Sequence, residues 1–236
     1  MRRDHHTWHS PNLDRQMELL AAGESGVPIL AFPPAGQRFS EWENQGMLNA
    51  ISDKIERGEL HVFCVDSVDS ESWLNPHAQP YDKVIRHLAY EQYILQEVLP
   101  LIRGTNATGE LQVTGCGFGG YHAFNMAMKH PHVVTGCVTM SGCFDVKPFV
   151  DGYYDNNVYF NNPLDYLPNL TDRWFLDRYA AMRIILATGE HDPWLAQNVR
   201  MGEILSDRGI RHVVDVWSDD VPNEWPLWRR MAVKFF

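Results

Sequence analysis

The sequence predicts a doubly wound α/β sheet, on three observations: nearly continuous apolar runs, helix-period segments between those runs, and a glycine-rich turn where a run meets a helix. Apolar runs of this kind are typical of parallel strands that are covered on both faces. Strands that alternate with helices join through right-handed crossovers. We therefore expect a single α/β domain over residues 1–236, with a mostly parallel sheet and helices on both faces.

The expected elements follow one another along the chain. Strands are expected where β-branched and aromatic residues gather, at 16–22, 27–32, 60–66, 111–115, 133–142, 183–189 and 212–217. Helices are expected where apolar residues recur every three to five positions, at 81–102, 118–130, 195–209 and 225–236. The stretch 144–179 breaks this alternation with prolines, asparagines and aromatic residues. We expect it to form an irregular insertion over the C-terminal edge of the sheet, either a lid or a passive cap.

Charge and composition narrow the classes of partner. The net charge is −10 and no clustered basic surface stands out, which argues against a nucleic-acid partner. The first residues, MRRDHHTWHSPNLDRQ, contain no apolar stretch, so neither a secretory signal nor a membrane anchor is expected and the predicted location is the cytoplasm. The four cysteines show no C-x-x-C spacing and are expected to be buried thiols.

The stretch GCGFGGYHAF, residues 115–124, ends one expected strand and opens an expected helix. In α/β hydrolases this tight turn has the pattern G-x-S-x-G, and its serine is the nucleophile. Here Gly117 occupies the serine position. The stretch also lacks the spacing of a dinucleotide fingerprint and the lysine of a phosphate-binding loop. No cofactor is therefore expected.

These residues resemble the "Putative esterase" family of α/β hydrolases, relatives of esterase D, in a bacterial cytoplasmic branch. The resemblance covers most of the chain and includes the stretches HSPNLDRQMELL, FPPAGQRFSEWENQGM, FCVDSVDSESW, DGYYDNNVYFNNP and ATGEHDPW. It implies an α/β-hydrolase fold that hydrolyses acyl esters through a serine, an aspartate and a histidine in that chain order. It also implies an oxyanion hole shared between two loops.

The nucleophile position and the oxyanion hole can be assigned from this resemblance. Gly117 lies in the nucleophile position, where glycine has no atom that can form an acyl-enzyme. Glycine adopts the positive φ of this turn almost freely, so loss of serine relieves backbone strain. The resemblance implies that the backbone N–H of Phe118 and one N–H from the turn that contains Ala35 and Gly36 form the oxyanion hole.

The acid position keeps a carboxylate, whereas the base position has lost its imidazole. Asp192 lies in the acid position, and it is equally well placed to cap the helix that follows. Asn223 lies in the base position, and an amide has no useful proton affinity near neutral pH. No histidine follows His212, so a small error of alignment does not restore the base. Glu224 is the nearby carboxylate that could activate water.

Other side chains near the turn offer weaker chemistry. Cys116 adjoins the nucleophile position, but its side chain is expected to point toward the sheet, so a buried thiol is favoured over a nucleophile. His122 and His191 are expected to be surface or supporting residues rather than general bases.

Two clusters have the composition of a metal site. His5, His6 and His9 could bind zinc or nickel, but a frayed N-terminus is favoured. The carboxylates of residues 66–71 lack the spacing of a calcium loop, so a solvated loop is favoured there. No metal is expected.

Three functions fit these residues. The favoured one is an esterase-fold protein with a degenerate triad and a binding or assembly role, with a small-molecule ligand in the residual pocket as one partner. The alternative is a weak or relocated hydrolase that uses pocket water and the oxyanion hole. A third is an interaction protein or homo-oligomer, based on the aromatic residues of the insertion, Tyr153, Tyr154, Tyr159 and Phe160.

Overall fold

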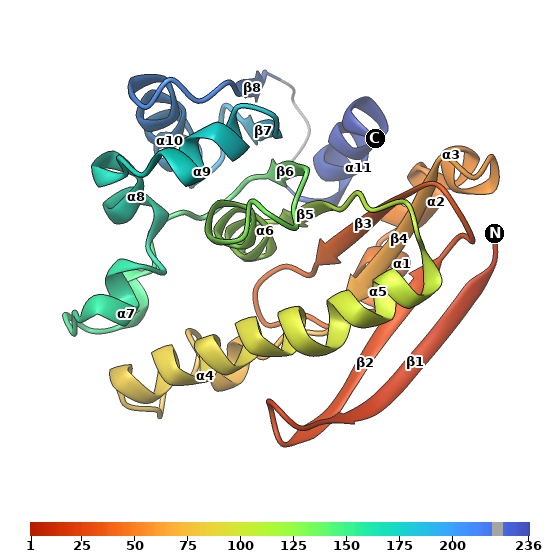
Figure 1. The fold of residues 1–236 in the computed structure, drawn as a ribbon, viewed down its shortest axis with the longest axis horizontal. Helices are drawn as coiled ribbons and strands as arrows, with labels where there is room; N and C mark the ends of the chain where they lie inside the picture. Colours follow the sequence, from red (N-terminus) through yellow and green to blue (C-terminus); the bar gives the residue numbers. More distant parts are fainter. Residues whose placement is uncertain (219–223) are drawn as a thin grey trace.

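The computed structural model describes residues 1–218 and 224–236. Within them one sheet has the strand order β1-β2-β4-β3-β5-β6-β7-β8 (Figure 1). The strands are β1 Arg3–Ser10, β2 Arg15–Ala22, β3 Val27–Phe32, β4 Leu60–Val65, β5 Gln112–Cys116, β6 Gly136–Met140, β7 Arg183–Gly189 and β8 Val213–Trp217. β2 pairs antiparallel with β1 and β4, and the other neighbours pair in parallel. The predicted mostly parallel sheet is confirmed.

Alternate residues of each strand enter two different apolar layers, because successive side chains of a strand point to opposite faces. In β3, Leu30 packs with one layer and Ile29 with the other. The first layer lies against α4 Pro80–Tyr93, α5 Leu99–Thr105, α6 Phe118–Lys129 and α10 Leu195–Asp207. The second lies against α1 Glu41–Asn44, α2 Met47–Ala50, α3 Ser52–Glu56 and α11 Trp225–Phe235. Helices on both faces are therefore confirmed.

The N-terminal residues form an ordered edge strand, which corrects the expectation of a frayed terminus. β1 pairs with β2 along its whole length. Its exposure alternates, and Trp8 faces inward, stacks on Tyr93 at 5.7 Å between ring centroids and donates to Glu97 at 2.6 Å. The alternation also places His6 on the face opposite to His5 and His9. No group of three potential ligand residues occurs in the described part of the chain.

The helix expected over 81–102 is interrupted in the structure. α4 ends at Tyr93, a π-helical segment Ile94–Val98 follows, and α5 begins at Leu99. Pro100 explains the interruption, because proline has no N–H to donate and its ring collides with the carbonyl group four residues earlier. A wider turn ahead of it relieves that collision.

The insertion 144–179 contains short helices rather than irregular chain alone. These are α7 Asn156–Tyr159, α8 Pro163–Tyr166 and α9 Arg173–Tyr179, with 3-10 turns at Lys147–Phe149 and Leu167–Asn169. Asp155 and Asp172 each accept a hydrogen bond from a backbone N–H in the first turn of the next helix. The polar residues that predicted irregularity are thus partly helix caps.

No helix in the described part of the chain has both the length and the apolar character needed to cross a lipid bilayer.

Candidate active site

The turn between β5 and α6 has the geometry of a nucleophile elbow. Gly117 has φ 56° and ψ −117°. A Cβ on Gly119 would lie 2.4 Å from the backbone oxygen of Pro33, and one on Gly115 would lie 2.2 Å from the carbonyl carbon of Gly119. Such distances leave no room for a side chain, so only glycine at these two positions lets α6 approach the strands so closely.

Backbone hydrogen bonds hold Gly117 in place. Its N–H donates to the Met140 oxygen at 2.8 Å, and its oxygen accepts from the N–H groups of Gly120 at 3.0 Å and Cys143 at 3.2 Å. A Cβ at Gly117 would meet no atom of another residue within 4 Å, its two chain neighbours excepted. The nucleophile position is therefore open in space, and what it lacks is a side chain.

The two backbone N–H groups expected to form the oxyanion hole differ in their hydrogen-bonding partners. Phe118 is the first residue of α6, so its N–H has no intrahelical acceptor and is directed out of the helix end. Gly36 lies in the exposed loop after β3, next to Ala35, and its N–H points toward the Asp69 carboxylate, with 3.4 Å between N and Oδ2. The second donor therefore already has a long contact with a carboxylate.

Asp192 follows β7 and is 7% exposed. Its Oδ1 accepts a hydrogen bond from the Trp194 N–H at 2.7 Å. Since α10 begins at Leu195, Asp192 closes the turn before the helix and is not its N-cap residue. Its Oδ2 is buried and has no partner among the described residues. One carboxylate oxygen is thus left for a hydrogen-bond donor or a water molecule.

The base position cannot be described in the same way. Asn223 lies outside the residues that the structure describes. Glu224 is exposed and occupies the N-cap position of α11, where its side chain makes no capping hydrogen bond. His191, in the loop before Asp192, is exposed and 3.3 Å from the Glu190 carboxylate. Both Glu224 and His191 are therefore exposed to solvent, and neither is held in a buried site.

The thiols near the turn are poor nucleophiles. Cys116 is fully buried in the layer that faces α11, on the side of the sheet away from α6, as expected. Burial raises the pKa of its thiol well above the ordinary value. Burial also raises the pKa of Cys143 to about 12, so neither cysteine forms much thiolate at neutral pH.

His122 and Asp69 form a buried pair beside the turn. Of the two alternatives for His122, surface or supporting residue, its 4% exposure rules out the surface. Asp69 was expected in a solvated loop and is 1% exposed, which corrects that expectation. The His122 Nε2 and the Asp69 Oδ1 are 2.7 Å apart. The imidazole also stacks on Phe32 and meets Phe118 edge to face.

The sequence carries a signal for this pair. The helix segment FGGYHAFNMAM contains no charged residue before Lys129, and a helix without a polar face is buried all round. His122 had to be inside for that reason. A buried imidazole needs a hydrogen-bonding partner, but its identity as Asp69, 53 positions away, follows only from the tertiary fold.

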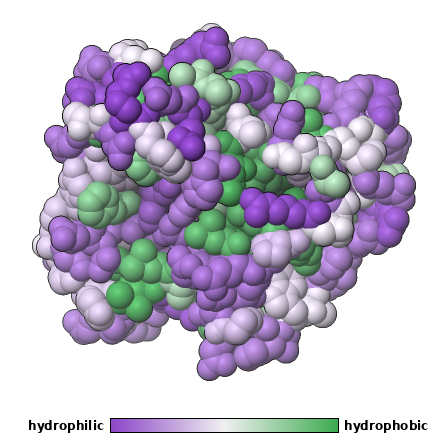
Figure 2. Space-filling view, viewed as in Figure 1, coloured by the Kyte–Doolittle hydropathy of each residue, from purple (hydrophilic) through white to green (hydrophobic). Residues whose placement is uncertain are grey.

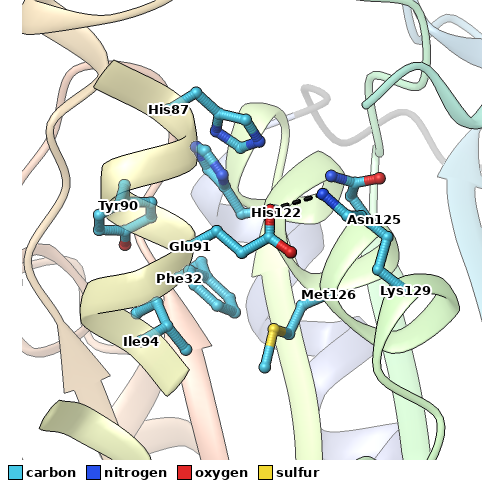
Figure 3. A pocket seen from close by; sticks show the side chains of 9 residues that line it. All are labelled: Phe32, His87, Tyr90, Glu91, Ile94, His122, Asn125, Met126 and Lys129. Atoms are coloured by element: carbon cyan, nitrogen blue, oxygen red, sulfur yellow. Dashed lines mark hydrogen bonds and ion pairs between the residues drawn. The ribbon is translucent and has the colours of Figure 1, made fainter. Parts of the chain in front are cut away.

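Further polar side chains continue from His122 along the interface of α4 and α6 (Figure 3). His87 Nε2 lies 3.1 Å from the Asn161 Oδ1, and burial lowers the pKa of His87 to about 3. Glu91 lies 2.5 Å from the Lys129 ammonium and 2.6 Å from His130 Nε2, and its pKa is lowered to about 2. The burial of Glu91 opposes this shift in its pKa, and its two hydrogen-bonded partners outweigh the effect of burial.

A cavity of about 20 Å³, enough for one water molecule, lies among these groups.

Comparison with known proteins agrees with this geometry. The family model described as "Putative esterase" matches residues 32–219. Among solved structures, the chain is similar to a ferulic acid esterase, with 13% identity, coverage of 99% of this chain and 96% of that one, and a TM-score of 0.78. It is also similar to an S-formylglutathione hydrolase from Agrobacterium tumefaciens, with 14% identity, coverage of 98% and 92%, and a TM-score of 0.74. No curated protein matches. At this identity the likeness to solved structures establishes the fold alone.

Proposed function

Since the chain belongs to the "Putative esterase" family of α/β hydrolases, we propose that it is a catalytically degenerate member, a pseudoenzyme, that keeps a binding or assembly role. The observation that carries the proposal is Gly117 at the vertex of an otherwise complete elbow. Ester hydrolysis by this fold begins when a side-chain oxygen attacks the acyl carbon. Gly117 has no such atom, and Asn223 in the base position could not accept the proton.

The remaining groups favour binding without turnover. The outward N–H of Phe118 is a donor for an acyl oxygen, and the unpartnered Oδ2 of Asp192 is an acceptor. Together they can orient a small polar ligand beside Gly117. They cannot form the covalent intermediate that divides hydrolysis into two steps.

A weakly active or relocated hydrolase is the second candidate, and the free Asp192 oxygen favours it. Such an enzyme would use a water molecule held by Asp192 or Glu224, with the Phe118 N–H stabilising the oxyanion. Disabled serine hydrolases retain roughly 10³-fold acceleration over water from oxyanion and binding contributions alone. Slow turnover by itself would therefore not separate the two candidates.

The proposal includes the surroundings in which the protein acts. We place it in the bacterial cytoplasm, without cofactor or metal and without a nucleic-acid or membrane partner, on its acidic charge of −10. Its partners would be a small-molecule ligand at the elbow and a second copy of the chain. Light scattering that found only monomer would remove the homo-oligomer.

The two candidates are distinguished by restoring the triad. We expect the wild type to show no saturable hydrolysis of p-nitrophenyl acetate, and the double variant Gly117→Ser with Asn223→His to show it. The matched control is Gly117→Ala with Asn223→His, which has the same added Cβ and no hydroxyl. Saturable hydrolysis by the wild type that Asp192→Asn abolishes would establish the second candidate instead.

A further inference from the structure

A second cavity lies between the C-terminal end of α6 and the insertion. Its volume is about 430 Å³, within the range of small-molecule sites. Five aromatic rings contribute to its wall, those of Tyr159, Phe160, Tyr166, Phe175 and Tyr179. With five rings in its wall, the cavity offers a concave, largely aromatic surface. Most of the molecular face drawn in Figure 2 is polar, and apolar surface gathers near its middle.

This cavity is separate from the elbow. Its α6 residues are Met128 and Lys129, which lie ten and eleven positions after Phe118. At 1.5 Å per residue the two ends of α6 are about 15 Å apart along the helix axis. A ligand in this cavity would therefore lie outside the site of the proposed function, and the inference does not depend on that function.

The aromatic residues of the insertion divide between two environments. Tyr159 and Phe160 line the cavity. Tyr153 meets Tyr81 edge to face and donates to Asp155, and Tyr154 donates to Asp165. Of the four residues that suggested an interaction surface, two therefore line a cavity that can hold a ligand.

Lys129 gives the cavity a cationic donor. An ammonium group has three N–H donors, and Lys129 uses one on Glu91 Oε2 and one on Asn161 Oδ1. Lys129 lines this cavity as well as the smaller one beside Glu91, and its third N–H is the donor left for a ligand. The adjoining His130 also lines the cavity and shares the Glu91 carboxylate. Because Glu91 stays ionised, it fixes the position of both side chains without using the third donor.

We propose that this cavity binds a planar aromatic carboxylate. The rings of Phe160 and Phe175 would cover the aromatic part, since stacked or edge-on rings add to the gain from apolar burial. The carboxylate would accept the third N–H of Lys129 in a charge-assisted hydrogen bond. The carboxylate at the rim, Asp172, accepts the Trp174 N–H through its Oδ1 and caps α9, and no hydrogen bond joins it to Lys129 among the described residues.

The experiment is titration calorimetry of the full chain with naphthoate and two matched ligands. Naphthamide keeps the rings and removes the charge, and cyclohexanecarboxylate keeps the charge and removes the rings. We expect naphthoate to bind, and each matched ligand to bind about tenfold more weakly, the effect of one charge-assisted hydrogen bond or one aromatic contact. Equal binding of naphthamide or of cyclohexanecarboxylate, or no binding of naphthoate at millimolar concentration, would overturn the proposal.

A pair of variants locates the bound ligand. Phe160 is 56% exposed and Tyr154 is 50% exposed, so replacing either by alanine leaves the core intact. Phe160→Ala should weaken naphthoate binding about tenfold, whereas Tyr154→Ala, in the same insertion but outside the cavity, should not change it. Unchanged binding by Phe160→Ala would place the ligand elsewhere and contradict the assignment. If that variant does not fold, the comparison of the three ligands on the wild type still decides.

Discussion

The turn at Gly117 and the interface between α4 and α6 meet on the same helix, yet they are held together in different ways. Backbone groups hold the turn, through the hydrogen bonds of Gly117 with Met140, Gly120 and Cys143. Side chains hold the interface, where Glu91 of α4 pairs with Lys129 of α6, and beside it His122 of α6 pairs with Asp69. A backbone-held turn keeps its shape when a catalytic side chain is lost, whereas a side-chain network does not survive the loss of a member. Under the proposed function, this difference explains how the elbow keeps its shape with Gly117 at its vertex.

The largest expected effect is at the close contact that supports the turn. In Gly119→Ala the new Cβ would lie 2.4 Å from the Pro33 oxygen and 2.6 Å from the Phe32 oxygen, both backbone atoms that cannot easily move. We expect the free energy of unfolding to fall by about 3 kcal/mol or more. Urea denaturation measures it. Gly104→Ala is the control, because a Cβ at that position in α5 meets nothing, and it should gain about 0.5–1 kcal/mol.

A single substitution at the interface between α4 and α6 should lower the free energy of unfolding by nearly as much. Glu91→Gln removes the negative charge that contacts Lys129 and His130, and leaves the Lys129 ammonium without a charged partner. We expect a loss of about 2–3 kcal/mol in the free energy of unfolding. Glu203→Gln, which breaks an exposed pair with Arg200, should change it by less than about 0.5 kcal/mol. Equal effects of the two substitutions would mean that the network does not stabilise the interface.

Restoring the serine alone should cost stability. Gly117→Ser meets no steric obstacle from the rest of the chain, but it forces a side chain onto φ 56°. We expect a loss of about 1–3 kcal/mol in the free energy of unfolding, and the same loss in Gly117→Ala. Thermal melts of both variants test this. A variant as stable as the wild type would show that the turn relaxes away from its strained conformation.

The smallest expected effect is a change in how the free energy of unfolding depends on pH. His87 has a folded-state pKa of about 3 because it is buried, whereas an unfolded imidazole takes up a proton below about pH 6.5. The unfolded state therefore binds more protons, and stability falls as the pH drops from about 6.5 toward 3, by up to about 1.4 kcal/mol per pH unit. In His87→Gln this loss should disappear between about pH 6 and 5, whereas the exposed control His77→Gln should keep it. Denaturation curves at the two pH values provide the test.

The features that the sequence predicted are those set by local pattern. The strand 183–189 and the helix 118–130 each carry a clear apolar period, and both occur within one residue of the expected bounds. The elbow at Gly117 was equally recognisable, because its glycines satisfy a local steric need. β1 was missed because its residues are mostly polar, and only its pairing with β2 makes it a strand.

The features that the sequence did not predict depend on contacts between distant residues. Asp69 was assigned to a solvated loop because a run of carboxylates usually lies in water, and only the packing of α6 shows that it faces His122. The aromatic cavity was also missed, because Met128 of α6 and Phe175 of α9 come to the wall of one cavity only in the folded chain. Burial and partners at such positions are decided by tertiary structure.

The central claim, that the elbow keeps its shape without its chemistry, is tested most directly by covalent labelling. A fluorophosphonate probe reacts with an activated serine nucleophile and leaves a mass that can be mapped to one residue. We expect mass spectrometry of intact wild-type protein to find no adduct, and the double variant Gly117→Ser with Asn223→His to be labelled at residue 117. An adduct on any side chain of the wild-type site would contradict the account.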